Sequence, residues 1–237
     1  MLFFFFMLVF NNGNAHHKIY SPRVEEGRQS FEWRGHFNLE SSNSIDKSYH
    51  QVFETEYSWN SYWQSEVEFH ISDKTDTPLD WEKTELQNQL QIIDLQYLAS
   101  ALYFSYNFNS SERKGDEIEY KFLNQFLFKE FSLITNFIFE KQIGTSASGS
   151  TEFGLSNYLE FSKNILNLFK IGLINFSEFG ELSNFHSLQK QEHQIGFLLG
   201  KEFLINKYEL ELELGYLKGI TKDASKNALI WNIEVEF

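Results

Sequence analysis

The segment at the carboxyl end of the chain alternates between apolar and polar side chains, and this period restricts the fold more than any other feature. The apolar positions are Leu229, Trp231, Ile233, Val235 and Phe237. Polar residues such as Glu234 and Glu236 stand between them. Successive side chains of a β-strand point to opposite faces, whereas the apolar positions of a helix would repeat about every 3.6 residues. The segment is therefore predicted to be a strand with one apolar face and one polar face.

The same period recurs along the rest of the chain and predicts about twelve strands, an even number that is typical of bacterial membrane β-barrels. The strands are expected at residues 29–39, 47–57, 62–71, 83–92, 99–109, 117–126, 132–143, 151–162, 168–179, 191–203, 207–217 and 228–237. Long polar connections alternate with short ones, as outer loops and periplasmic turns do in such barrels. The boundary at 93–98 is the least defined, because few polar turn residues stand there.

These patterns predict an all-β fold: a single transmembrane antiparallel up-and-down β-barrel. Each expected strand is close to the roughly nine to eleven residues that a tilted strand needs to cross a bilayer. The chain has only 2 Pro and is 18% aromatic, which favours strands. A lipocalin-like soluble barrel would instead place the apolar face inside. Periodicity alone does not separate the two, but strand length and both ends of the chain favour the membrane barrel.

The amino end indicates secretion, because Met1–Phe10 is almost wholly apolar yet too short to span a bilayer as a helix. Gly13 and Ala15 provide the small-x-small pattern of a signal-peptidase site. The sequence departs from a common secretory signal in having no Lys or Arg before Lys18. We expect a signal peptide at 1–15 and one mature barrel domain at 16–237.

The polar face of the strands is expected to line the lumen. Its predicted members are Glu32, Arg34, His36, His50, Glu54, Glu56, Glu66, Glu68, His70, Glu85, Gln87, Gln89, Gln91, Glu209, Glu211, Glu213, Glu234 and Glu236. A dry soluble core could not hold so many carboxylates, since unpaired buried charge is costly. The opposite face, with Trp33 and Phe53 among its members, is predicted to meet lipid.

The first two hairpins predict a cluster in this lumen. If they are symmetric about Asn43 and Asn60, one row across three strands holds His36, His50 and His70. A second row, one step deeper, would hold Glu32, Glu54 and Glu66. Opposed imidazoles could share a proton or a metal ion such as zinc. The favoured interpretation is a polar layer bridged by water, without a metal.

Little in the sequence indicates catalysis or a cofactor. No Ser, His and acid set stands at a recognisable spacing, and there is no Gly-rich phosphate loop. The chain has no Cys, which excludes thiolate chemistry and disulfides. Its net charge of −13 argues against a nucleic-acid partner. A non-enzymatic protein is therefore favoured, and a lipid-modifying enzyme of the outer membrane is kept as an alternative.

Two segments carry resemblances to known proteins. The alternating end with Phe237 resembles the assembly signal of bacterial outer-membrane proteins. The pattern His17-x-Ile19-Tyr20-x-Pro22, followed by Phe31-Glu32-Trp33-Arg34-Gly35, resembles an uncharacterised family of proteobacterial outer-membrane barrels. The resemblance implies fold and location and lends no catalytic residues. The expected partners are outer-membrane lipid and the barrel assembly machinery. The alternation of long loops with short turns predicts that both termini lie in the periplasm.

The function expected from the sequence is a small pore or solute channel that favours cations, because a carboxylate-lined tube concentrates positive ions. Small cationic solutes would be its cargo. Twelve strands enclose a lumen between that of filled eight-strand barrels and that of open porins. Long side chains could fill such a lumen. A closed structural or surface-interaction barrel without transport is therefore the main alternative.

Overall fold

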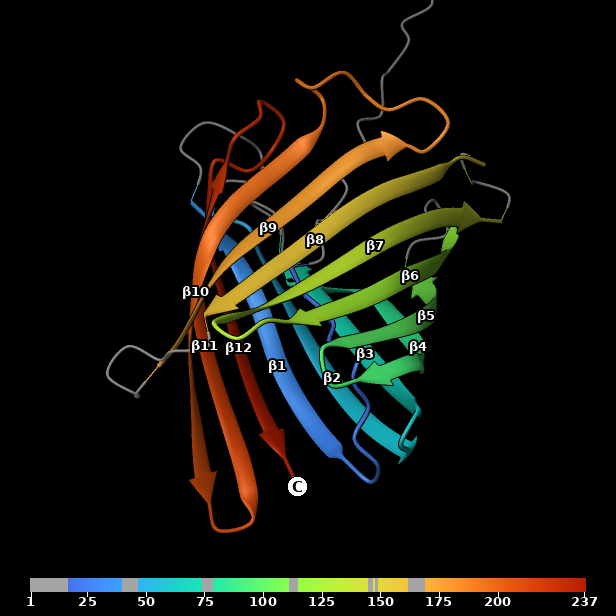
Figure 1. The fold of residues 1–237 in the computed structure, drawn as a ribbon. Coiled ribbons are helices and arrows are strands. Elements are labelled where there is room, and N and C mark those ends of the chain that lie inside the picture. The colour runs from blue at the N-terminus through green and yellow to red at the C-terminus, as the bar shows by residue number, and fades with distance from the viewer. Residues whose placement is uncertain are drawn as a thin grey trace, which may run out of the picture.

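The computed structural model describes residues 17–39, 47–73, 79–110, 115–144, 147, 149–161 and 169–237. The predicted signal peptide at 1–15 lies outside these residues. All regular elements among them are strands, and they form one closed barrel (Figure 1). None of the described residues forms a helix that is long and apolar enough to cross a membrane.

The described residues contain twelve strands, each antiparallel to its neighbours, and β1 pairs with β12 to close the barrel. They are β1 (Gln29–Asn38), β2 (Tyr49–Asn60), β3 (Trp63–Asp73), β4 (Asp80–Leu95), β5 (Leu98–Asn109), β6 (Asp116–Leu127), β7 (Phe131–Ile143), β8 (Thr151–Phe161), β9 (Lys170–Glu181), β10 (Glu192–Ile205), β11 (Tyr208–Gly219) and β12 (Asn227–Glu236). The predicted fold class is confirmed, and each expected strand has a counterpart. The uncertain boundary at 93–98 is a tight turn between Leu95 and Leu98.

The two ends of the barrel differ. At one end β1 begins and β12 ends, and the Phe237 N–H donates to the Gln29 carbonyl at 3.0 Å. We call this the short-turn end, since tight turns such as the one between Ile205 and Tyr208 also lie there. The opposite end carries the longer connections, such as 182–191, and we call it the long-loop end (Figure 1).

The outer surface of the barrel is apolar. Large side chains that point outward remain well exposed, among them Phe197 at 52% and Leu214 at 58%. Burial alternates with exposure along single strands. In β1, for example, Phe31 is exposed, whereas Glu32 and Arg34 are buried. A closed antiparallel sheet pairs the backbone hydrogen-bonding groups of every strand and has no edge. Together with the apolar exterior, this is what a bilayer requires.

The predicted register is confirmed in the first hairpin and wrong in the second. His36 lies opposite His50, and Glu32 lies opposite Glu54. His50, however, pairs with Ser72 rather than His70. The turn is centred between Ser61 and Tyr62 and not on Asn60, because Asn60 pairs with Trp63, and this alone moves the pairs by three residues. The extra residue of β2 between Ser58 and Asn60 takes one of them back, so the net displacement is two.

The predicted row of carboxylates, Glu32, Glu54 and Glu66, is wrong at Glu66 for the same reason. Glu54 lies opposite Glu68, and Glu66 lies opposite Glu56. The turn and the extra residue together shift the pairs by two, and a shift of two keeps every side chain on its original face. The register shift therefore changes which side chains lie opposite one another on β2 and β3, but these side chains still face the lumen.

Candidate functional site

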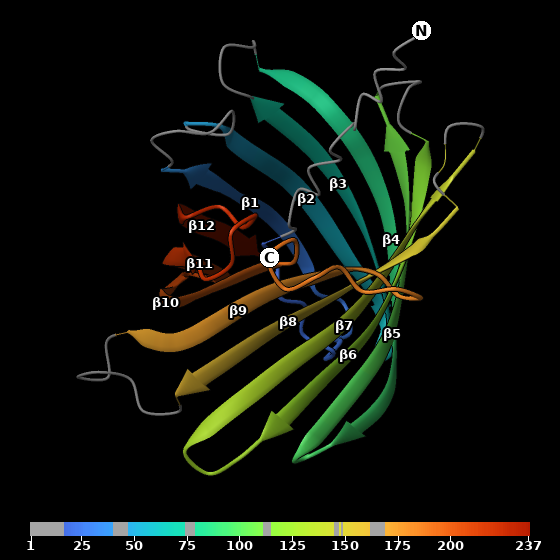
Figure 2. The same ribbon diagram turned by 90° about the horizontal axis from the view of Figure 1, so that it is seen from above.

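The lumen contains a segment of the chain that sequence reasoning did not place there. Residues 17–28, called the N-terminal segment below, run inside the ring of strands before β1 begins (Figure 2). Tyr20 is 4% exposed. Its backbone N–H donates to the Asn136 Oδ1 at 2.8 Å, and its carbonyl accepts from the Asn136 Nδ2 at 3.0 Å. A single wall amide thus satisfies both backbone groups of Tyr20.

Further wall amides of β4 hold the N-terminal segment closer to the short-turn end. The Ser21 carbonyl accepts from the Gln89 Nε2 at 3.0 Å, and the Val24 N–H donates to the Gln91 Oε1 at 2.9 Å. An extended chain away from any sheet needs such partners, because buried backbone groups are costly when unpaired. Gln89 and Gln91 of β4 therefore have a structural role that alternation alone did not reveal.

The basic residues of the N-terminal segment neutralise part of the acidic wall. The Lys18 Nζ lies 2.6 Å from the Glu54 Oε1 and 3.5 Å from carboxylate oxygens of both Glu32 and Glu66. At the short-turn end, Arg23 reaches Asp94 at 2.7 Å. One lysine thus contacts all three carboxylates of the predicted row, Glu32, Glu54 and Glu66.

Arg34, a residue of β1 in the barrel wall, also contacts carboxylates of this cluster. Its guanidinium lies 2.6 Å from the Glu32 Oε1 and 2.7 Å from the Glu68 Oε1, and it also contacts Glu54. The predicted lumen residues near this cluster are buried: Glu32, Arg34, His36, His50, Glu54, Glu66, Glu68 and His70. Glu85, Gln87, Gln89 and Gln91 of β4 are buried as well. The other predicted positions are half-buried: Glu56, Glu209, Glu211, Glu213, Glu234 and Glu236.

Four imidazole rings follow one another across the lumen. The Nδ1 atoms of His17 and His36 are 3.2 Å apart, and the ring centroids of His36 and His50 are 5.5 Å apart. Despite the corrected register, the His50 Nε2 lies 3.2 Å from the His70 Nδ1. Sequence reasoning found three of these rings and missed His17, because it did not place the N-terminal segment in the lumen.

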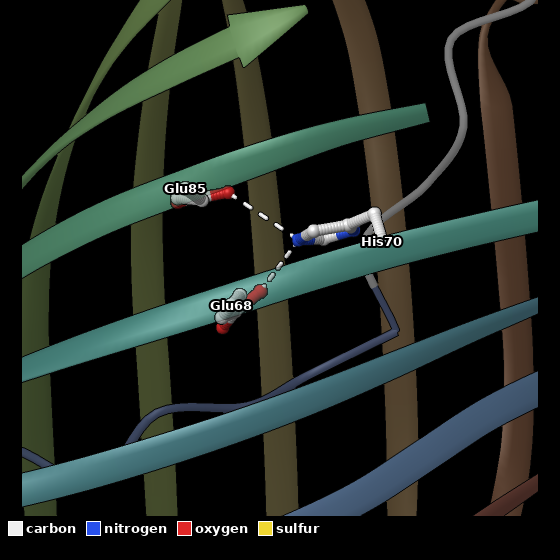
Figure 3. Close-up of side chains that lie close together, drawn as sticks. All are labelled: Glu68, His70 and Glu85. Carbon is white, nitrogen blue, oxygen red and sulfur yellow. Dashed lines mark hydrogen bonds and ion pairs between the residues drawn. The ribbon is translucent and has the colours of Figure 1, made fainter. Parts of the chain in front are cut away.

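The far side of His70 faces two carboxylates. Figure 3 shows the His70 Nε2 pointing between Glu68 and Glu85, at 2.7 and 3.7 Å from their nearer oxygens. All three side chains are less than 2% exposed. Their ligand atoms are close enough together to hold a metal ion.

A cavity of about 360 Å³ remains beside the N-terminal segment. Much of its lining comes from β8 to β12, including Tyr158, Lys170, Glu211 and Glu213. Part of the wall is apolar, formed by a cluster of Ile174, Phe176, Leu198, Leu217, Ala228 and Ile230 against which Ile19 packs. The lumen wall is therefore not polar throughout, contrary to the expectation from the sequence. Its apolar part packs against Ile19 of the N-terminal segment.

The predicted assembly signal forms β12 and closes the barrel. Leu229 is 38% exposed on the outer face and Phe237 is 55% exposed. Trp231 lies over Gly35 of β1, where an added Cβ would stand 2.5 Å from the indole ring. Gly35 thus makes room for Trp231 at the closing seam. The remaining members of the predicted signal, Ile233 and Val235, pair with Trp33 and Phe31.

Comparison of the sequence finds no matching model of a protein family and no matching curated protein. Solved structures do match. The KdgM porin aligns with a TM-score of 0.58 at 9% identity, covering 88% of this chain and 98% of the porin. The NanC porin aligns with a TM-score of 0.59 at 13% identity, covering 87% and 98%. At such low identities the likeness shows the fold alone, a porin-type barrel of nearly the same extent.

Proposed function

We propose that the protein is a small channel of the bacterial outer membrane whose lumen is narrowed by its own N-terminal segment. The observation that carries the proposal is the cavity beside that segment, since a barrel built only as a wall needs no such space. The likeness to the KdgM and NanC porins supports the same function. In this proposal the short-turn end faces the periplasm, as short turns do in known barrels.

Charge in the cavity supports a modest preference for cations. Seven carboxylates line it: Glu32, Glu56, Glu66, Glu160, Glu211, Glu213 and Glu234. Five basic side chains offset them: Lys18, Arg23, Arg28, Arg34 and Lys170. The excess of acid attracts cations, while the basic groups weaken the field that a purely acidic tube would have. A cavity of about 360 Å³ has room for a small solute.

The test is single-channel conductance of the refolded mature chain in a planar bilayer under a salt gradient. We expect small discrete openings and a cation-selective reversal potential. Glu213→Gln should shift that potential toward zero, because Glu213 lines the cavity at half-burial. The matched control is Glu130→Gln, at the exposed turn after β6, which should leave selectivity unchanged.

One result would overturn the proposal, and another would overturn only its cation preference. A correctly inserted barrel that shifts in gel mobility on heating but stays silent in the bilayer would indicate a closed structural barrel. Openings with anion selectivity would reject the cation preference while retaining the channel.

A further inference from the structure

His17 attaches the N-terminal segment to the barrel wall through its side chain. Its Nε2 lies 2.8 Å from the Gln194 Oε1 of β10, and its Nδ1 lies 3.2 Å from the His36 Nδ1 of β1. Its ring also meets the Phe176 ring of β9 edge-on, with centroids 5.1 Å apart, and neither Phe176 nor Gln194 titrates. Among the described residues, backbone hydrogen bonds between the segment and the wall begin at Tyr20. The start of the segment therefore depends on the contacts of this imidazole.

The hydrogen bonds of His17 fix where its hydrogen lies. The Gln194 Nε2 donates to the Ser225 carbonyl at 3.4 Å, which leaves the Gln194 Oε1 facing His17. The His17 Nε2 therefore carries a hydrogen, and in the neutral ring the Nδ1 keeps the lone pair. The His36 Nδ1–H donates to that lone pair. The two facing nitrogens thus share a single hydrogen.

Two protonated rings do not fit this contact. Once both Nδ1 atoms carry a hydrogen, two positive donors face each other at 3.2 Å with no acceptor between them. The titratable groups next to the pair add no negative charge. His50 of β2 stacks on His36 with ring centroids 5.5 Å apart, and Lys18 follows His17 in the segment.

The other close pair of imidazoles differs in two respects. The His50 Nε2 and the His70 Nδ1 are also 3.2 Å apart, but both rings stand on paired strands of the wall, so repulsion does not separate them. They also face carboxylates, with Glu82 at 3.7 Å from His50 and Glu68 at 2.7 Å from His70 (Figure 3). Within the described part of the chain, the pair at the start of the segment forms no such ion pair.

We propose that protonation of His17 and His36 in mildly acidic solution releases the start of the N-terminal segment from the wall, and that this release widens the channel. The widening rests on the proposed function. His17 already lines the cavity, and the excess of carboxylates there favours a released imidazolium. Lys18 and Tyr20 keep their own contacts, so the rest of the segment stays docked.

Acid favours release because the released pair binds more protons than the docked pair. Below about pH 6.5, the ordinary pKa of histidine, both separated rings take up a proton, whereas the docked pair holds one at most. The equilibrium therefore shifts toward release as the pH falls. One extra proton shifts it by about 30-fold between pH 7.5 and pH 5.0.

The test follows the mobility of a spin label and needs no transport activity. The chain has no Cys, so His16→Cys carries a single nitroxide next to His17 in the sequence of the refolded mature chain. We expect its electron paramagnetic resonance spectrum to be immobilised at pH 7.5 and mobile at pH 5.0, reversibly. His17→Gln and His36→Gln should each abolish this difference, because a glutamine amide accepts a hydrogen bond from a protonated ring. The matched control is His193→Gln, which should keep the difference, since His193 bonds to Gln191 and lies outside the pair.

A spectrum that does not change with pH would overturn the proposal. So would a response that persists in both variants of the pair, since it would then come from carboxylates. If a variant fails to refold, the midpoint of the response in the labelled chain decides: a midpoint above about pH 5 supports histidine, and a lower one rejects the proposal.

Single-channel conductance at the two pH values separates this inference from the proposed function. We expect conductance to rise at pH 5.0. Openings that do not change with pH, with a label that stays immobilised, reject the inference and retain the channel. A label that becomes mobile on a silent barrel rejects the channel and retains the release.

Discussion

At the scale of residues, the lumen holds its charges by pairing them across elements that are distant in sequence. Lys18 and Arg34 together contact four carboxylates, which would otherwise repel one another in a partly dry interior. The sequence predicted the faces of these residues, because alternation fixes the face. It could not predict their partners, because Lys18 lies before the first strand in a stretch without any period.

Replacing Lys18 with Met tests how much this pairing stabilises the barrel. The substitution leaves Glu54, which is 3% exposed, with one fewer cation, and should lower the free energy of unfolding by roughly 3 kcal/mol. The measurement is urea unfolding of the refolded protein followed by tryptophan fluorescence. Lys129→Met, at a side chain that is 93% exposed, is the control.

Glu54→Gln in the Lys18→Met background should restore part of the loss, because the charge left without its lysine is then removed as well. An unchanged unfolding midpoint in Lys18→Met would mean that water, and not the lysine, solvates these carboxylates.

At the scale of elements, the period of two residues predicted all twelve strands and the first hairpin register. The second hairpin differed because its turn lies further along the chain than expected, and a pattern that counts only faces does not detect the net shift of two residues. The apolar wall over β9 to β12 was also missed. Ile174, Leu198 and Ile230 read as lumen positions by alternation, but only the docked N-terminal segment explains why apolar side chains occupy them.

Two glycines on the inner face of β10 should respond differently to one added methyl group. A Cβ at Gly196 would lie 1.9 Å from the Tyr216 carbonyl oxygen, so backbone must move. At Gly200 the nearest atoms are 3.4 Å away in the flexible Glu213 side chain. Gly196→Ala should lower the free energy of unfolding by about 2 kcal/mol, and Gly200→Ala by less than about 0.5.

Urea unfolding midpoints of the two variants give the comparison directly. Equal midpoints would show that β10 and β11 separate easily at Gly196, contrary to the close approach in the structure.

At the scale of the whole molecule, the N-terminal segment and a cavity beside it share the lumen. The N-terminal segment bonds to side chains of β1 to β4, β6 and β7, and also to Gln194 of β10 and Glu234 of β12. The cavity borders β8 to β12 and also residues of β1 to β4, such as Glu32 and Glu66. A sequence can predict that a barrel forms and how many strands it has. Whether the lumen is filled depends on contacts between the segment and eight strands, which no local pattern encodes.

Removing residues 16–24 should therefore enlarge the pore and change its charge. The deletion takes away Lys18 and Arg23 from the cavity lining. We expect conductance to rise several-fold and cation selectivity to increase, measured in planar bilayers. The control deletes 183–190, a stretch of similar length in the connection between β9 and β10. Unchanged conductance after the first deletion would show that the segment does not limit passage.

The position of the N-terminal segment also has a consequence for the order in which the molecule is built. The segment is enclosed by a ring whose last seam joins β1 to β12, and β12 is the last strand to be synthesised. Most of its polar partners belong to the strands made earlier. The segment can thus settle on an open, curved sheet and be present when the seam closes, so the chain does not have to thread it into a finished tube.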